Sequence, residues 1–165
     1  MTEIRGLFLA AATAAADLLA APEVAAAWHE PSALAKLSVR GLAGHLAGQV
    51  LFVPPMLDGP EATEEVISVH DYYARAAWIG SDLDDEFNTG MRALGEKDAA
   101  QGPEALAARV AATVEELRSA LPSAPSRPVR RSSWGPTRSP WTASSPPGCW
   151  RSRCTATTWR TAWAY

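Results

Sequence analysis

The segment 28–53, WHEPSALAKLSVRGLAGHLAGQVLFV, constrains the fold of this chain more than any other stretch. It contains a proline turn and then Ser38, a residue type that caps the N-termini of helices. Apolar residues recur after it at spacings of three and four, which places them on one helix face that we expect to be buried. A histidine lies in the middle of this face, which consists of Leu42, His45, Leu46, Gln49, Val50 and Val53.

The histidine of this face, His45, has two ordinary interpretations. It is either a hydrogen-bonded residue of the core or a ligand that points into a cavity between helices. A single imidazole does not specify a metal, because a catalytic zinc site takes about three protein ligands. The segment by itself therefore leaves both interpretations open.

Helical spacing continues through most of the chain up to residue 121. We expect helices over 2–20, 39–53, 61–78, 82–94 and 104–121, with a turn around Pro22 and a helix stop at Pro54 and Pro55. Four or five such helices with short connections predict an all-α, up-and-down bundle. In the first helix the spaced residues are Ile4, Leu7, Phe8, Ala11, Ala15 and Leu18.

The N-terminal segment superficially resembles a signal peptide because it is rich in alanine and leucine. Asp17 interrupts its apolar run, however, and the helical spacing favours an amphipathic first helix. No apolar stretch reaches the length of a membrane span. We therefore expect a soluble, cytoplasmic protein without a membrane partner, and the sequence leaves its oligomeric state open.

The character of the chain changes after residue 121. All 18 acidic residues lie at or before Glu116, whereas the segment from Ser119 onward contains 7 Arg and no acid. Seven of the 13 prolines and five of the seven tryptophans also lie from Pro122 onward. One interpretation is a disordered basic arm whose tryptophans stack on nucleic-acid bases. Disordered segments are normally poor in tryptophan, which makes nucleic acid an unfavoured partner.

A second interpretation of this tail is a coding sequence read in the wrong frame. Shifting the frame lets the region 148–164 encode VLEVEVHGDDLADSVG, which restores acids, helical spacing and a Glu-x-x-x-His pair together. Two domains follow from the change in character. We expect residues 1–121 to form an incomplete metal-binding helical bundle and residues 122–165 to form an irregular, disordered tail that is out of frame.

The pieces PSAL and LSVRGLAGHLAGQ resemble the N-terminal metal-binding domain of mycothiol-dependent maleylpyruvate isomerases. That family belongs to the DinB-like superfamily of four-helix bundles, and the resemblance covers roughly residues 2–121 in this frame. It implies a divalent metal, usually zinc, held by one histidine of the second helix and a Glu-x-x-x-His pair of a later helix. His45 matches the first of these ligands.

The resemblance also implies mycothiol as cofactor and a small electrophile such as maleylpyruvate as substrate. A metal-activated thiolate would catalyse cis–trans isomerisation or thiol transfer. The Glu-x-x-x-His pair has no counterpart in this frame, since its codons would overlap Trp150–Arg151 and Cys154–Thr155. The resemblance therefore implies an enzyme that is impaired in this frame. The alternative is a non-catalytic bundle whose basic tail binds nucleic acid or a protein partner.

Other polar residues favour ordinary roles. The acidic group Asp82, Asp84, Asp85 and Glu86 could bind a hard cation, but it lacks the pattern of a calcium loop and indicates an exposed helix start. His70, Asp71 and Tyr72 indicate a helix surface more than a substrate cluster. Arg75 and Arg92 could bind a carboxylate substrate, although nothing selects them, and His29 is expected to face water.

Overall fold

The computed structural model describes residues 3–59, 69–74 and 79–124. Within these ranges the ordered elements are helices, together with one isolated β-bridge between Pro31 and Ser38. The all-α prediction is therefore confirmed for this part of the chain. None of the helices in it combines the length and the apolar character that crossing a membrane requires. Of the tail predicted to be irregular, residues 125–165 lie outside the described residues.

The described residues belong to two compact units. The first unit contains residues 1–54 and 81–124, and the second contains residues 55–80 and 125–165. Helix α5 (Val69–Ala74) lies in the second unit, within the helix predicted over 61–78. The remainder of that predicted helix lies outside the described residues, and the domain boundary predicted at residue 121 stays a prediction.

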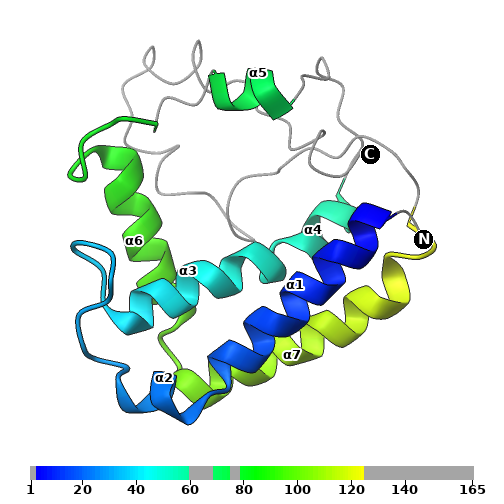
Figure 1. Cartoon of the computed structure of the whole chain (residues 1–165), viewed down its shortest axis with the longest axis horizontal. Coiled ribbons are helices and arrows are strands. Elements are labelled where there is room, and N and C mark those ends of the chain that lie inside the picture. Colours follow the sequence, from blue (N-terminus) through cyan, green and yellow to red (C-terminus); the bar gives the residue numbers. More distant parts are fainter. Residues whose placement is uncertain (1–2, 60–68, 75–78, 125–165) are drawn as a thin grey trace. The chain divides into compact units, whose positions relative to one another are not determined.

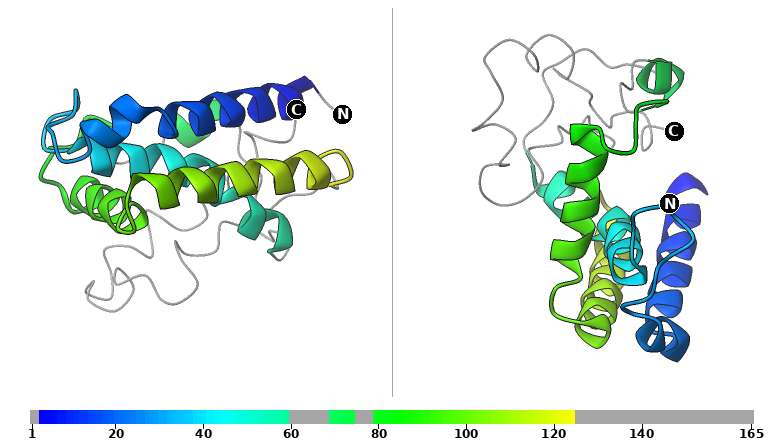
Figure 2. Two further views of the ribbon diagram at one scale, coloured as in Figure 1. Left: turned by 90° about the horizontal axis from the view of Figure 1, so that it is seen from below. Right: turned by 90° about the vertical axis from the view of Figure 1, so that its left-hand side faces the viewer.

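Four long helices build the first unit (Figure 1). Helix α1 (Glu3–Leu19) packs against α7 (Pro103–Ala120), and both pack against α3 (Val39–Leu51). Helix α6 (Glu86–Asp98) packs on the other side of α3. The two further views show that α6 crosses α3 steeply, whereas α1 and α7 run alongside one another (Figure 2). Helix α3 is thus the central element of the unit.

Short helices begin at or directly before prolines where the sequence predicted only a turn or a helix stop. Pro22 begins a short helix, α2 (Pro22–Ala26), where only a turn was expected, because proline fits the first turn of a helix. Helix α3 ends at Leu51, close to the expected stop, but α4 (Val53–Asp58) resumes directly afterwards with Pro54 and Pro55 in its first turn. These prolines end one helix and begin another, since a first turn needs no backbone N–H from them.

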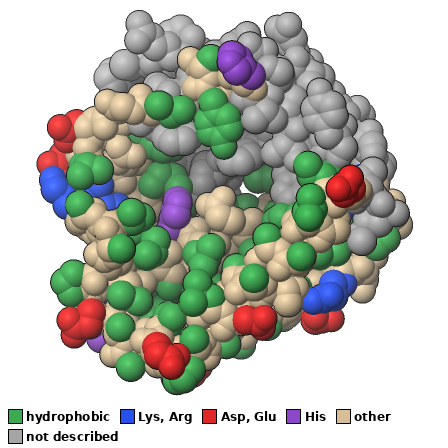
Figure 3. All heavy atoms as spheres, in the orientation of Figure 1, with side chains coloured by type: hydrophobic (Ala, Val, Ile, Leu, Met, Phe, Trp, Pro, Cys, Tyr) green, Lys and Arg blue, Asp and Glu red, His purple; other side chains and the backbone are tan. Residues whose placement is uncertain are grey.

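The inward face of α1 differs from the expected one. The buried residues are Leu9, Ala12 and Leu19, whereas Leu7 and Leu18 are 62% and 55% exposed. Apolar side chains are visible along this outer surface of α1 (Figure 3). The helix is apolar on several sides, so spacing alone could not identify the side that meets its neighbours.

The contact between α1 and α7 consists of side chains that fill a core. Leu106, Val110, Val114 and Leu117 of α7 are buried, and their spacing of three and four places them on one face of the helix. Polar contacts cross the edges of the contact: Arg118 donates to the hydroxyl of Thr13 at 2.8 Å, and Arg5 donates to the carbonyl of Leu121 at 2.9 Å. The second bond satisfies one of the carbonyls that the end of a helix leaves without a partner.

Candidate functional site around His45

The start of α3 is fully capped by the loop that precedes it. Ser38 is the N-cap, as predicted, and its hydroxyl accepts a hydrogen bond from the amide of Gly41 at 2.9 Å. The amide of Val39 donates to the carbonyl of Glu30, and that of Arg40 donates to the carbonyl of Trp28. These bonds occupy the N–H groups that could otherwise bind an anion at a helix N-terminus. The buried ring of Trp28 anchors the same loop.

The buried faces of α3 consist of small residues, contrary to the expected stripe. Of the predicted face only Val50 and Val53 are buried, while His45 is half-buried and Gln49 is exposed. The residues that actually face inward are Gly41, Ala43, Gly44, Ala47, Gly48 and Val50. A pattern based on hydrophobicity misses such faces because glycine and alanine add little apolar surface, yet they let another helix approach closely.

Three glycines bring the backbones of α3 and α6 into direct contact. A Cβ atom on Gly44 would overlap the carbonyl oxygen of Gly95, and one on Gly95 would overlap the carbonyl oxygen of Gly41. The same Cβ position on Gly95 lies 3.2 Å from the backbone nitrogen of His45. The backbone of His45 therefore begins at the edge of the closest contact between the two helices.

A polar cluster fastens this contact at the start of α3. The hydroxyl of Ser38 donates to Oε1 of Glu96 at 2.5 Å, and Nε of Arg40 lies 3.1 Å from Oε2 of the same carboxylate. The Arg40–Glu96 ion pair is not a hydrogen bond, because the buried Nε of Arg40 has no acceptor in hydrogen-bond geometry. Arg40 also donates from its terminal nitrogen to the carbonyl of Glu96 at 2.9 Å. We call Ser38, Arg40 and Glu96 the Glu96 cluster.

His45 itself is half-buried, and burial lowers its pKa below the ordinary value of 6.5. Its imidazole makes no hydrogen bond to the residues that the structure describes, and its backbone carbonyl accepts from Gln49 at 3.3 Å. A neutral imidazole keeps a nitrogen lone pair available for a metal. The expected alternative, a core histidine held by hydrogen bonds, lacks a partner for the ring within the described ranges.

No group of three or more metal-binding side chains occurs in the described part of the chain. His45 is the one predicted ligand within it, and one imidazole does not make a tight zinc site. The residues that would overlap the codons of the missing pair, Trp150–Arg151 and Cys154–Thr155, lie outside the described ranges. Of the three ligands that the resemblance implies, the described residues therefore contain only the candidate His45.

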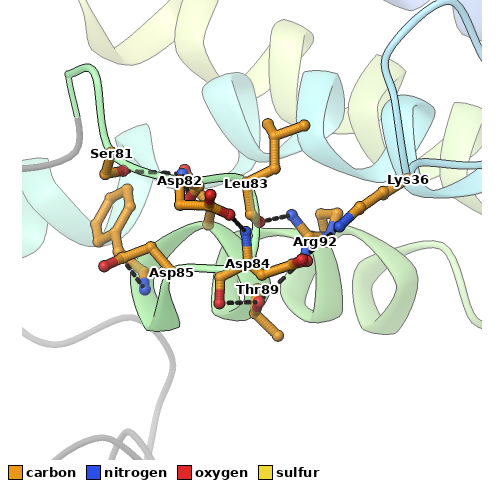
Figure 4. Close-up of polar contacts among 10 residues, drawn as sticks. Lys36, Ser81, Asp82, Leu83, Asp84, Asp85, Thr89 and Arg92 are labelled. Atoms are coloured by element: carbon orange, nitrogen blue, oxygen red, sulfur yellow. Dashed lines mark hydrogen bonds and ion pairs between the residues drawn. The ribbon is translucent and has the colours of Figure 1, made fainter.

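The acidic group ahead of α6 is a helix start rather than a cation site. Asp85 is the N-cap and accepts from the amide of Phe87, and Asp82 accepts from the amide of Asp84 (Figure 4). Asp84 is paired with Lys36 at 2.5 Å, and this hydrogen bond and the charge of the ammonium group lower the pKa of Asp84. Helix α6 begins four residues later than predicted because these acids form its cap and the loop before it, and it also ends four residues later, at Asp98.

The remaining candidates do not join His45. Arg92 donates to the carbonyl of Leu83 at 2.6 Å and lies 3.8 Å from Asp84, so this helix–loop contact occupies its guanidinium group (Figure 4). His29 is exposed, as expected, and His70 is exposed on α5. Arg75 and the side chains of Asp71 and Tyr72 are outside the described part. Sequence reasoning missed Glu96 and Gly95, although the glycine spacing in LSVRGLAGHLAG was a signal of close helix packing.

A family model, the mycothiol maleylpyruvate isomerase N-terminal domain, matches residues 8–159 of the chain. No curated protein and no solved structure gives a significant match. The matched range includes the helices that position His45 and continues into the tail past Leu121. The family match does not test whether the tail is out of frame, so the frameshift interpretation stays a proposal. The match extends over most of the chain, and the protein therefore belongs to the mycothiol maleylpyruvate isomerase N-terminal domain family.

Proposed function

We propose that this protein derives from a mycothiol-dependent isomerase or thiol transferase in which His45 is one ligand of a divalent metal, zinc. The metal, when bound, would lower the pKa of the cofactor's thiol so that a thiolate is available at neutral pH. A small electrophile with a cis double bond, such as maleylpyruvate, is the proposed substrate. Family membership supports mycothiol as the cofactor.

The half-buried imidazole of His45 is the observation that carries the metal proposal. Burial favours its neutral form, which is the form that binds a metal. The backbone contact between α3 and α6 adjoins this residue, so its backbone position is well defined. Both features suit a ligand built on a rigid scaffold element.

The second part of the proposal concerns the tail. A Glu-x-x-x-His pair places two ligands on one helix face, and codon choices consistent with residues 148–164 can encode such a pair in the shifted frame. In the present frame we expect zinc to bind weakly, because His45 would act without these partners. Sequencing the gene across the codons of Leu121–Arg131 tests this directly, and an intact frame there would remove the frameshift from the proposal.

Zinc binding by the full chain and by a frame-restored version tests the role of His45. We expect the frame-restored protein to hold about one zinc ion and the present chain to bind zinc much more weakly. His45→Ala should abolish the tight site in the restored protein. His29→Ala is the matched control, since it removes an exposed histidine from a loop. Equal zinc content in the His45→Ala and His29→Ala proteins would refute the ligand assignment.

A further inference from the structure

Residues 95 and 96 of α6 act on α3 in two different ways. Gly95 contributes the backbone surface against which Gly41 and Gly44 rest, and Glu96 contributes the carboxylate of the Glu96 cluster. The glycine contact sets how closely the two helices approach. The polar cluster adds directed contacts, which oppose rotation and sliding of α3 against α6.

The Glu96 cluster is directional because each partner uses different atoms. The Ser38 hydroxyl has one proton, which it gives to Glu96, while its oxygen accepts from the amide of Gly41. Arg40 contacts both the carboxylate and the backbone carbonyl of Glu96. The first turn of α3 is thereby held at two positions by one residue of α6. His45 follows this turn and has its backbone nitrogen beside Gly95.

We propose that Glu96 is the positioning residue of the His45 site: through Ser38 and Arg40 it fixes the rotation of α3 against Gly95 and thereby the direction of the His45 side chain. The proposal rests on the proposed function for its purpose, since a metal ligand must be held within about 0.5 Å of its productive place. The proposed effect of Glu96 on the orientation of His45 is a property of the metal-free protein and can be measured in that form. Glu96 acts on the site through α3, without touching the imidazole.

The test compares Glu96→Ala and Glu96→Gln in the full, metal-free chain by NMR. We expect Glu96→Ala to shift the signals of the His45 amide and imidazole and to speed hydrogen exchange at the Gly41 amide by about tenfold, the effect of losing about one hydrogen bond. Glu96→Gln should give smaller changes, because its amide oxygen still accepts from Ser38. This graded response distinguishes positioning from a general loss of charge.

Two control variants separate positioning from other effects. Glu115→Gln removes the exposed ion pair with Arg118 on α7 and should leave the His45 signals unchanged. Val110→Ala removes buried volume from α7 and lowers stability without altering the Glu96 cluster. The proposal is overturned if the NMR signals of His45 do not shift in Glu96→Ala. It is also overturned if Val110→Ala lowers the melting temperature as much as Glu96→Ala does and shifts the His45 signals by the same amount.

Titration of the frame-restored protein and its variants with Zn²⁺ alone then tests whether the Glu96 cluster supports metal binding. We expect Glu96→Ala to weaken zinc binding by about tenfold or more, the range seen when supporting contacts of a metal ligand are lost. If Zn²⁺ leaves the His45 signals of the frame-restored protein unchanged, the proposed role of His45 as a metal ligand is wrong. The spectra of the metal-free variants still decide whether Glu96 orients His45. The two failures are thus distinguishable.

Discussion

The two main helix contacts of the first unit are built on opposite principles. Helices α1 and α7 meet through leucine and valine side chains that are removed from water, with arginine contacts at the edges. Helices α3 and α6 meet through the backbones of glycines, with a carboxylate cluster at one end. The first contact gains stability from buried area, and the second gains a defined helix position from close approach. The candidate ligand His45 lies beside the second contact.

The largest effect is expected at the side-chain contact. Leu117→Ala should destabilise the protein by about 2–5 kcal/mol, because a fully buried leucine leaves a cavity that a packed core cannot close. Urea denaturation followed by circular dichroism measures the change. Leu7→Ala on the exposed side of α1 is the control and should have a much smaller effect. Similar losses for the two variants would show that the assigned inner face of this contact is incorrect.

At the backbone contact, adding a single methyl group should be harmful. Gly44→Ala is expected to cost about 1–3 kcal/mol or more, since its Cβ would overlap the rigid carbonyl of Gly95. Gly48→Ala is the matched control on the same helix, where the new Cβ meets only the ring edge of Phe52 at 3.1 Å. Alanine favours helix formation by about 1 kcal/mol, so this second change should be close to neutral or stabilising. Equal costs for both would contradict the close contact.

A smaller effect concerns the pH dependence of stability in the metal-free protein. Burial lowers the pKa of His45, so the unfolded chain binds a proton at a higher pH than the folded chain. Its contribution to stability is therefore complete above 6.5 and is lost as the pH falls from that value through the folded pKa. His45→Gln should flatten the stability profile in this window, and His29→Gln, which removes an exposed loop histidine, is the control variant. An unaltered profile in His45→Gln would mean that the imidazole is not buried.

The smallest effect lies in the loop ahead of α3. Lys36 has a φ of 64°, a conformation that costs a residue other than glycine about 1–2 kcal/mol, while its ammonium group pairs with exposed Asp84. Lys36→Gly relieves the backbone but removes an ion pair that solvent screens, and it makes the unfolded chain more flexible. We expect these changes nearly to cancel in thermal denaturation. A large loss in Lys36→Gly, absent in Lys36→Asn, would identify backbone flexibility as the cause.

How much of the structure could be predicted differs between the same two contacts. The stripe of α7 follows directly from leucine and valine at helical spacing, and Ser38 was recognisable as an N-cap from its type and place. The inward face of α3 was not recognisable, because its Gly and Ala residues carry little hydrophobic signal. The partnership of Glu96 with Ser38 and Arg40 joins residues 58 and 56 positions apart, which no local pattern contains.

The candidate site was likewise predictable only in part from the sequence. His45 was selected from its place in a helix and from the family resemblance, and the structure places it on α3 in a half-buried position. Its neighbours on α6 depend on a steep helix crossing that the sequence does not encode locally (Figure 2). The exposed face of α1 shows the converse difficulty, since an apolar residue such as Leu18 can lie in water.

The hydrogen bond from Arg5 to the carbonyl of Leu121 has a consequence for protein engineering. It brings the beginning of the first helix and the end of the last helix of this unit within the reach of a short linker. The order of the helices along the chain is then separable from their packing, as in circular permutation. A permuted gene could begin at α7 and continue through a linker into α1. In such a protein the linker would take the place of the residues that follow Ala124, and the His45 helix would be retained.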